Sequence, residues 1–177
     1  MKRSMIRRIA LPVVVIALAA GVVLAASLSS LLPGSGTIPG WKVVAGSSRG
    51  GSDNDTLYGI YDGAVDGLRQ KGLKEAYQRQ YEKGDARITA DVFRFGSWQQ
   101  AKAYYVEQRN GNSSAGWFKT YSDVKEQGFI AENAGAIVGM LWGKTYTVQI
   151  GIAGSGNDAR YEVYKFLKNI SGRIQNS

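Results

Sequence analysis

Two carboxylates four residues apart are the first candidates for chemistry in this chain. Asp62 and Asp66 lie in the segment Thr56 to Lys71, whose apolar residues recur with helical spacing. On one helix the two carboxylates would lie side by side, which could serve a glycosidase or bind a divalent cation, with Asp53 or Asp55 nearby. The same helical wheel places both opposite the apolar face, so a solvated acidic face is the other interpretation.

The residues that are missing exclude much of the usual catalytic repertoire. The chain has no cysteine and no histidine. Disulfides, thiolate and imidazole metal sites, cysteine nucleophiles, Ser-His-Asp arrangements and a lipid-modified cysteine are therefore excluded. We expect no cofactor and no metal site, and we favour binding over catalysis.

Two glycine-rich segments resemble phosphate-binding turns. Gly46 to Ser52 precedes a helix, but Asp53 and Asp55 occupy the positive end of that helix and would repel an anion. The segment 154–159 matches Gly-x-Gly-x-x-Ala, yet a dinucleotide site needs a further parallel strand, and only 18 residues follow Ala159. We expect a loop with an Asp N-cap in the first case and a turn with Asp158 capping the last helix in the second.

Two segments predict β-hairpins. Residues 73–82 and 86–96 flank Gly84-Asp85, a suitable two-residue turn, which places Tyr81 opposite Ile88 and Glu75 opposite Arg94. Residues 136–142 and 145–152 flank Gly143-Lys144, which places Ile137 opposite Ile150.

The reverse faces of these hairpins provide the candidate ligand site. Phe93 and Phe95 of the first hairpin and Met140 and Trp142 of the second would line a shared groove if both hairpins lie in one sheet. The alternative is that a helix covers these four side chains, since helices commonly pack on such sheets.

Other segments predict helices and one aromatic loop. Ser97-Trp98-Gln99-Gln100 has capping-box spacing and begins a helix to about Arg109, with Trp98 among its expected buried residues. The last helix carries a buried stripe through Val163, Phe166, Leu167, Ile170 and Ile174.

Two further features of the sequence leave alternatives open. Gly59, Gly63 and Gly67 recur every four residues and predict a flank where another backbone packs closely, or a surface where a ligand lies. The loop from 112 to 123 carries Trp117, Phe118 and Tyr121, which either cover the core or line a site.

The order of these elements predicts an α+β fold. We expect an antiparallel β-sheet of about five or six strands with three helices packed against it, preceded by an N-terminal hydrophobic helix. We assign residues 1–31 to a signal or membrane anchor, 32–40 to a linker, and 41–177 to a single exported domain.

The N-terminus carries the signal for export. Four cations in the first eight residues precede an apolar run over residues 9–28, which predicts that the following domain is placed across the membrane. The run just reaches the length needed to span a bilayer, which favours an anchor in the cytoplasmic membrane. It also ends in small residues, as at Val23-Leu24-Ala25 and Ala25-Ala26-Ser27, where a signal peptidase could cut and release a periplasmic or secreted domain.

The net charge of +8 does not predict nucleic-acid binding. Beyond residue 31 the chain has 18 cations against 14 acids, and they are interspersed rather than gathered into a basic face. The expected partners are the membrane through residues 9–28, if they are retained, and a small ligand or a protein partner.

Several short motifs resemble an exported bacterial family, domain of unknown function 6599. They are Tyr61-Asp62-Gly63-Ala64, Gly72-Leu73, the charged tyrosine-rich hairpin, Phe95-Gly96-Ser97 with the helix over 101–105, Phe129, and the run 142–148. The resemblance covers about residues 39–153 and departs from the family at the glycine-rich loop 46–52. That family has no assigned activity, so the resemblance implies one exported α+β domain of bacterial type.

Three functions follow from the sequence. The leading interpretation is a non-catalytic exported or membrane-tethered domain that binds a small ligand or a protein partner. The alternatives are a carboxylate-based enzyme or metal-dependent module using Asp62 and Asp66, and a structural subunit of the cell envelope.

Overall fold

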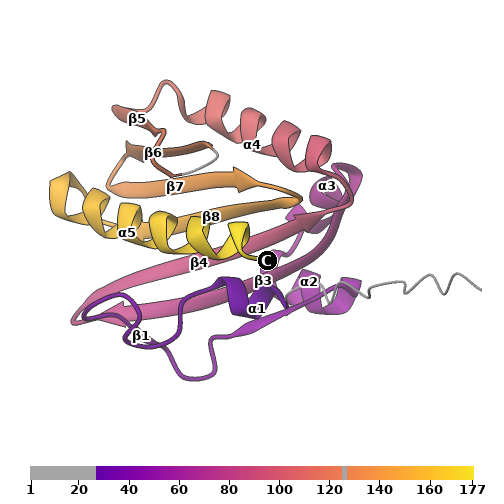
Figure 1. The fold of residues 1–177 in the computed structure, drawn as a ribbon, viewed down its shortest axis with the longest axis horizontal. Coiled ribbons are helices and arrows are strands. Elements are labelled where there is room, and N and C mark those ends of the chain that lie inside the picture. Colours follow the sequence, from indigo (N-terminus) through magenta and orange to yellow (C-terminus); the bar gives the residue numbers. More distant parts are fainter. Residues whose placement is uncertain (1–26, 125–126) are drawn as a thin grey trace, which may run out of the picture.

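The computed structural model describes residues 27–124 and 127–177. Within these residues the chain forms an α+β fold with an eight-stranded antiparallel sheet and five helices (Figure 1). The strands follow the order β1-β3-β4-β8-β7-β6-β5, and β2 also pairs with β3. Their bounds are β1 Lys42–Val43, β2 Arg49–Gly51, β3 Leu73–Lys83, β4 Ala86–Phe95, β5 Trp117–Tyr121, β6 Gln127–Asn133, β7 Ala136–Gly143 and β8 Tyr146–Ala153.

The expected fold class is confirmed, and the strand count is higher than expected. Two strands lie in segments that we expected to be loops, β2 in the glycine-rich segment and β5 in the aromatic loop. Both are short and gain their hydrogen bonds from a long neighbour, β2 from β3 and β5 from β6. Pairing with β3 therefore stabilises β2, whose sequence Arg-Gly-Gly gives little strand signal, whereas β5 consists mostly of aromatic and β-branched residues that favour strands.

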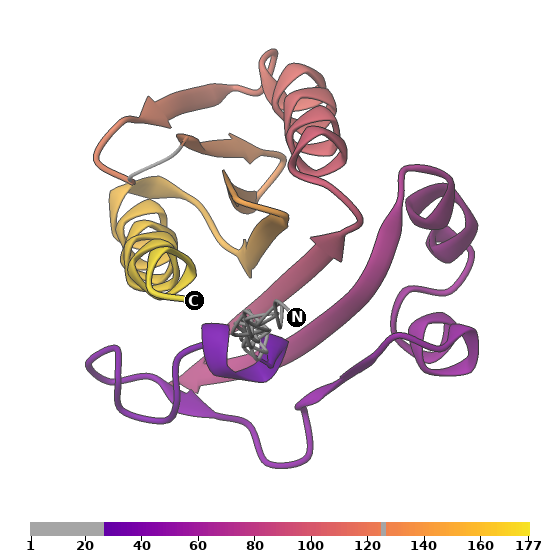
Figure 2. The same cartoon turned by 45° about the vertical axis from the view of Figure 1, so that its right-hand side comes forward.

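The two long helices cover opposite faces of the sheet. The helices are α1 Leu28–Leu31, α2 Asn54–Tyr61, α3 Ala64–Gln70, α4 Trp98–Asn112 and α5 Gly156–Gln175. Helix α5 packs on β7 and β8 from one side and α4 packs on the same strands from the other, while α2 and α3 lie beside β2 and β3 (Figure 2). The expected stripe of α5 is confirmed, since its five apolar residues are all buried. In α4, Trp98 was expected to be buried but is 51% exposed; it is the first residue of the helix and precedes the buried Ala101, Tyr104 and Tyr105.

The first hairpin has the expected register, with Tyr81 opposite Ile88 and Glu75 opposite Arg94. The register of the second hairpin was wrong by two residues. The turn falls at Lys144-Thr145, with Lys144 at φ +52°, so Ile137 lies opposite Ile152 instead of Ile150. A shift of two keeps every side chain on its expected face, because side chains alternate with a period of two.

The expected helix over residues 56–71 is two short helices. Asp62 ends α2 with φ +49°, and α3 begins again at Ala64. The expected close packing along Gly59, Gly63 and Gly67 was wrong, because a Cβ added at any of the three would meet nothing within 4 Å. These glycines border solvent.

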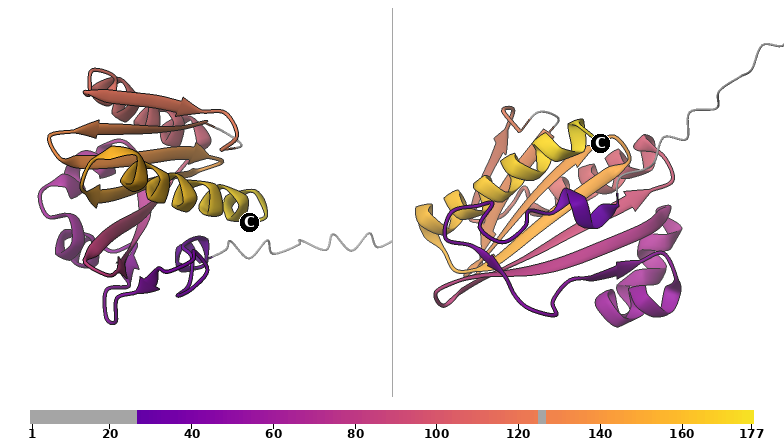
Figure 3. Two further views of the ribbon diagram at one scale, coloured as in Figure 1. Left: turned by 90° about the vertical axis from the view of Figure 1, so that its left-hand side faces the viewer. Right: turned by 60° about the horizontal axis from the view of Figure 1, so that its bottom comes forward.

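The folded domain begins before the expected boundary at residue 41. Leu28, Leu31, Leu32 and Ile38 are buried in the same core as α5. The hydroxyl of Tyr81 donates to the Pro33 carbonyl at 2.8 Å, and Arg173 donates to the Ser30 carbonyl at 3.1 Å beside the end of α5 (Figure 3). Residues 32–40 therefore pack on the domain instead of forming a free linker, since their apolar side chains complete the core.

The expected N-terminal hydrophobic helix covers residues 9–28. Residues 9–26 lie outside the described part of the chain, and only residues 27 and 28 fall within it. Over residues 27–124 and 127–177 no helix has both the length and the apolar character to cross a membrane.

Candidate functional site

The expected aromatic groove is part of the protein core. Phe93, Phe95 and Met140 are buried, and the ring of Tyr104 from α4 lies 6.0 Å from that of Phe93 and 5.3 Å from that of Phe95. Trp142 is half-buried, with the Lys102 ammonium 5.4 Å from its ring centre. The expectation of an open ligand groove was wrong and the alternative interpretation, a covering helix, is confirmed, because α4 packs on this face of the sheet.

The acidic pair does not form the expected arrangement. Asp62 caps the end of α2 and Asp66 lies in the first turn of α3, so the two are not neighbours on one helix. Asp66 accepts a hydrogen bond from the Tyr58 hydroxyl at 2.5 Å, and both carboxylates are exposed. The described ranges contain no cluster of three or more acidic side chains that could hold a metal ion.

The glycine-rich turns already have their helix ends capped. Asp53 accepts from the Thr56 amide at 2.8 Å as expected, and the hydrogen bonds from Thr56 hold the pKa of Asp53 below its usual range. At α5 the expected cap, Asp158, lies inside the first turn. The Gly156 amide donates instead to the Glu132 carboxylate, at 3.2 and 3.3 Å. A carboxylate of the chain thus occupies the place that a phosphate would take.

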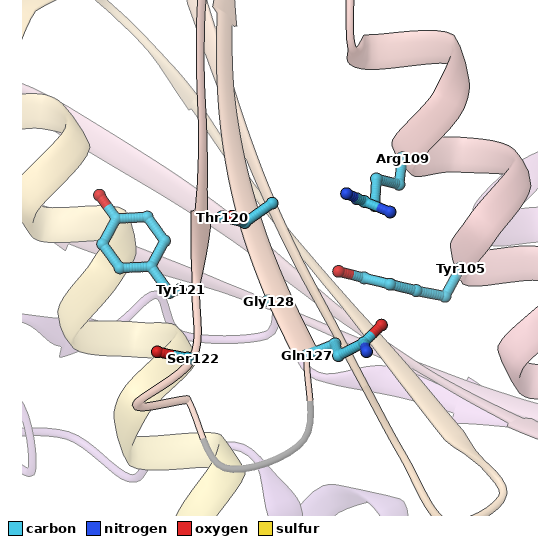
Figure 4. A pocket seen from close by; sticks show the side chains of 7 residues that line it. All are labelled: Tyr105, Arg109, Thr120, Tyr121, Ser122, Gln127 and Gly128. Atoms are coloured by element: carbon cyan, nitrogen blue, oxygen red, sulfur yellow. The ribbon is translucent and has the colours of Figure 1, made fainter.

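A small open hollow lies between α4 and the β5–β6 end of the sheet (Figure 4). Its volume is about 230 Å³. Tyr105 and Arg109 project into it from α4, one turn apart, and face Thr120 of β5 and Gln127 of β6 (Figure 4). Tyr121 points to the other side of β5 (Figure 4), because consecutive side chains of a strand alternate between faces.

The ring of Tyr105 is anchored in the core while its hydroxyl faces the hollow. The ring packs 5.7 Å from that of Phe129 and the residue is buried. Burial raises the pKa of Tyr105, and the Arg109 guanidinium beside it lowers it by less. The phenol therefore stays protonated at neutral pH and can donate a hydrogen bond to a ligand.

Arg109 supplies the charge of the hollow. It lies in the last turn of α4, where a cation is favoured by the helix dipole. Among the described residues it enters none of the ion pairs and none of the side-chain hydrogen bonds. A half-buried guanidinium next to a phenol, a hydroxyl and an amide can bind a carboxylate or a phosphate group.

A second polar group, missed in the sequence, joins α2 to the sheet. Asp91 accepts from the Gln78 amide at 2.9 Å and from the Tyr61 hydroxyl at 3.0 Å, and Arg49 donates to the Gln78 carbonyl oxygen at 3.1 Å. The expected register of the first hairpin already placed Gln78 opposite Asp91. Two inward polar residues facing each other were the available signal for this network.

The fold and the hollow define an α+β domain with a polar pocket beside one helix. No family model matches the chain, and no curated protein matches it. Among solved structures, the chain is similar to the extracellular domain of PknH from Mycobacterium tuberculosis, with a TM-score of 0.57 and 13% sequence identity. The match covers 84% of this chain and 95% of that one. At this identity the similarity shows a shared fold.

Proposed function

We propose that the chain is a non-catalytic extracytoplasmic domain held at the membrane by the part of the apolar run 9–28 that precedes the buried Leu28. The basic and apolar start of the sequence supports this placement. The structural neighbour is itself an extracellular domain, which supports it independently. The proposed relation to domain of unknown function 6599 agrees with export and adds no activity.

The proposed activity is the binding of a small anion in the hollow between α4 and β5–β6. The observation that carries this proposal is the Arg109 guanidinium, which faces the hollow without an ion-pair partner in the described part of the chain. A carboxylate or phosphate there would gain charge-assisted hydrogen bonds from Arg109 and neutral donors from Tyr105 and Thr120. The volume of about 230 Å³ suits a small metabolite rather than a polymer.

Calorimetric titration of the full chain in detergent tests the proposal, with inorganic phosphate and citrate as probes and glycerol as the neutral comparison. We expect saturable binding of at least one anion and none of glycerol. Arg109→Gln should weaken that binding by about 10- to 100-fold, because a hydrogen bond to a charged group contributes about 1.5 to 3 kcal/mol.

Arg87→Gln is the matched control. Arg87 is an exposed arginine whose ion pair with Glu82 lies at the β3–β4 turn, outside the hollow. We expect this variant to bind the anion as the wild type does. Equal losses in both variants, or no anion binding at millimolar concentration, would contradict the proposal.

A further inference from the structure

Four aromatic side chains form a surface on the opposite side of β5 from the hollow. We call this the aromatic surface: Trp117 and Tyr121 of β5, with Tyr161 and Tyr164 of α5. The ring of Tyr164 lies 5.0 Å from that of Tyr121 and 6.3 Å from that of Tyr161, and Tyr161 is 60% exposed. An aromatic ring this exposed contributes little to the core, and here it adjoins three further rings.

Each ring of the aromatic surface has a cation over it. The Arg160 guanidinium lies 4.2 Å from the Trp117 ring centre, and the Lys119 ammonium lies 5.1 Å from that of Tyr121. Lys165 and Lys168 lie 5.0 and 5.6 Å from the rings of Tyr161 and Tyr164. Three of these cations also pair with acids, since Arg160 contacts Glu132, Lys165 contacts Glu162 and Lys168 contacts Asp123. Lys119 enters no ion pair among the described residues and is exposed.

The surface is hollowed on both sides of the Tyr161–Tyr164 pair. One hollow of about 310 Å³ is lined by Trp117, Tyr121 and Asn157. The other, of about 340 Å³, includes Thr37, Lys168 and the amide of Asn169. Tyr161 and Tyr164 line both, so a ligand could extend from one hollow to the other across their rings.

We propose that the aromatic surface binds a glycan chain. The apolar face of a sugar ring carries C–H groups that pack on the electron-rich face of an aromatic ring. The hydroxyls around that sugar ring require donors and acceptors, which Asn157 and Thr37 supply at the edges. The side-chain nitrogen of Asn169 adds a donor, because its Oδ1 already accepts from Arg173. Lys119 adds an exposed positive charge, so a glycan that carries carboxylates binds more tightly than a neutral one.

The composition of the surface disfavours other partners. A protein partner would need an interface core depleted of charge, whereas a cation adjoins each of these rings. A nucleic acid would need an excess of cations, whereas acids neutralise three of the four. The C-terminal end of α5 lies beside α1, where the described chain begins (Figure 3), whereas Tyr161 and Tyr164 lie in the first half of α5. These two rings thus lie toward the opposite end of α5 from α1.

The test is calorimetric titration of the full chain with two hexasaccharides, neutral chitohexaose and acidic hexagalacturonate. The protein is kept in a phosphocholine detergent, because detergents with sugar headgroups would compete for the site. We expect both glycans to bind, with hexagalacturonate tighter. Tyr161→Ala should weaken both by about 2- to 13-fold, since an aromatic contact contributes about 0.5 to 1.5 kcal/mol. Lys119→Ala should remove the preference for the acidic glycan.

Trp98→Ala is the control, because Trp98 is also a largely exposed aromatic residue but lies at the start of α4. It should leave both titrations unchanged. Binding that Tyr161→Ala does not alter, or no binding of either hexasaccharide at millimolar concentration, would overturn the proposal. Tyr161, Trp117 and Lys119 do not line the Arg109 hollow. A failure of glycan binding at the aromatic surface can therefore be told apart from a failure of anion binding at Arg109.

Discussion

Asp91 is a carboxylate held inside the protein by two neutral donors. It is 7% exposed, its contacts are the Gln78 amide and the Tyr61 hydroxyl, and both bonds go to the same oxygen, Oδ1. Burial raises the pKa of Asp91, although the two hydrogen bonds and the charge of Arg49 lower it in part. The folded state therefore favours the protonated form more than the unfolded state does.

Asp91→Asn should stabilise the domain at pH 7, where burial penalises the charged form of Asp91. The asparagine carbonyl oxygen can accept both hydrogen bonds, while the cost of burying a charge disappears. Since the folded pKa is raised, Asp91 favours folding most below its unfolded pKa, near 3.8, and this contribution is lost as the pH rises through the folded pKa. The advantage of the variant should thus shrink towards pH 4, as measured by urea unfolding of both proteins from pH 4 to 8.

Asp91→Leu is the comparison for this prediction. It removes both acceptors and leaves the Tyr61 hydroxyl and the Gln78 amide unpaired, so we expect a loss of about 1 to 3 kcal/mol at every pH. If Asp91→Asn instead lowers the free energy of unfolding by the same amount from pH 4 to 8, the charge of Asp91 is not the deciding factor.

Individual elements were predictable where the signal is local. The Gly84-Asp85 turn and the alternation of β3 and β4 gave the correct register. The expected Ser97 cap of α4 is also present, because the Ser97 hydroxyl accepts from the backbone N–H of Gln100 at 3.2 Å. The break at Asp62 was not predictable from periodicity, because the apolar spacing continues through it. The burial of Phe93 and Phe95 depended on where α4 lies, and the pocket at Arg109 depends on elements distant in sequence, so helical or strand spacing could not reveal it.

Helix α5 packs closely on β7 through Gly139. A Cβ built on Gly139 would lie 2.4 Å from Cγ1 of Val163 and 2.9 Å from Cδ1 of Leu167. Gly139→Ala should therefore push α5 away from the sheet and lower the free energy of unfolding by about 1 to 3 kcal/mol. Thermal unfolding followed by circular dichroism measures the change.

Gly67→Ala is the matched substitution in α3. A Cβ there meets nothing within 4 Å, so the change should raise stability by about 0.5 to 1 kcal/mol through helix propensity alone. A loss of stability at Gly67, or none at Gly139, would contradict this account of how the helices pack.

At the scale of the whole molecule, the apolar run of the sequence ends inside the folded domain. Leu28 ends the apolar run of the sequence and is also buried in the core under α5. Both candidate cleavage positions, after Ala25 and after Ser27, precede Leu28. Either one would leave the core intact, so the structure is compatible with an anchor and with a cleaved signal.

The contribution of residues 28–40 can be tested by truncation. A chain starting at residue 41 lacks Leu28, Leu31, Leu32 and Ile38, which are each at most 4% exposed, and removes the acceptor at Pro33 from the Tyr81 hydroxyl. Loss of a single buried leucine side chain typically costs about 2 to 5 kcal/mol, and a domain has only about 5 to 15 kcal/mol in total. We therefore expect residues 27–177 to unfold cooperatively on heating and residues 41–177 to show no cooperative transition.

Leu31→Ala in the longer chain should lower the midpoint without abolishing the transition, which separates the loss of core packing from the loss of chain length. Equal midpoints for the two truncated chains would mean that residues 28–40 add nothing to the core.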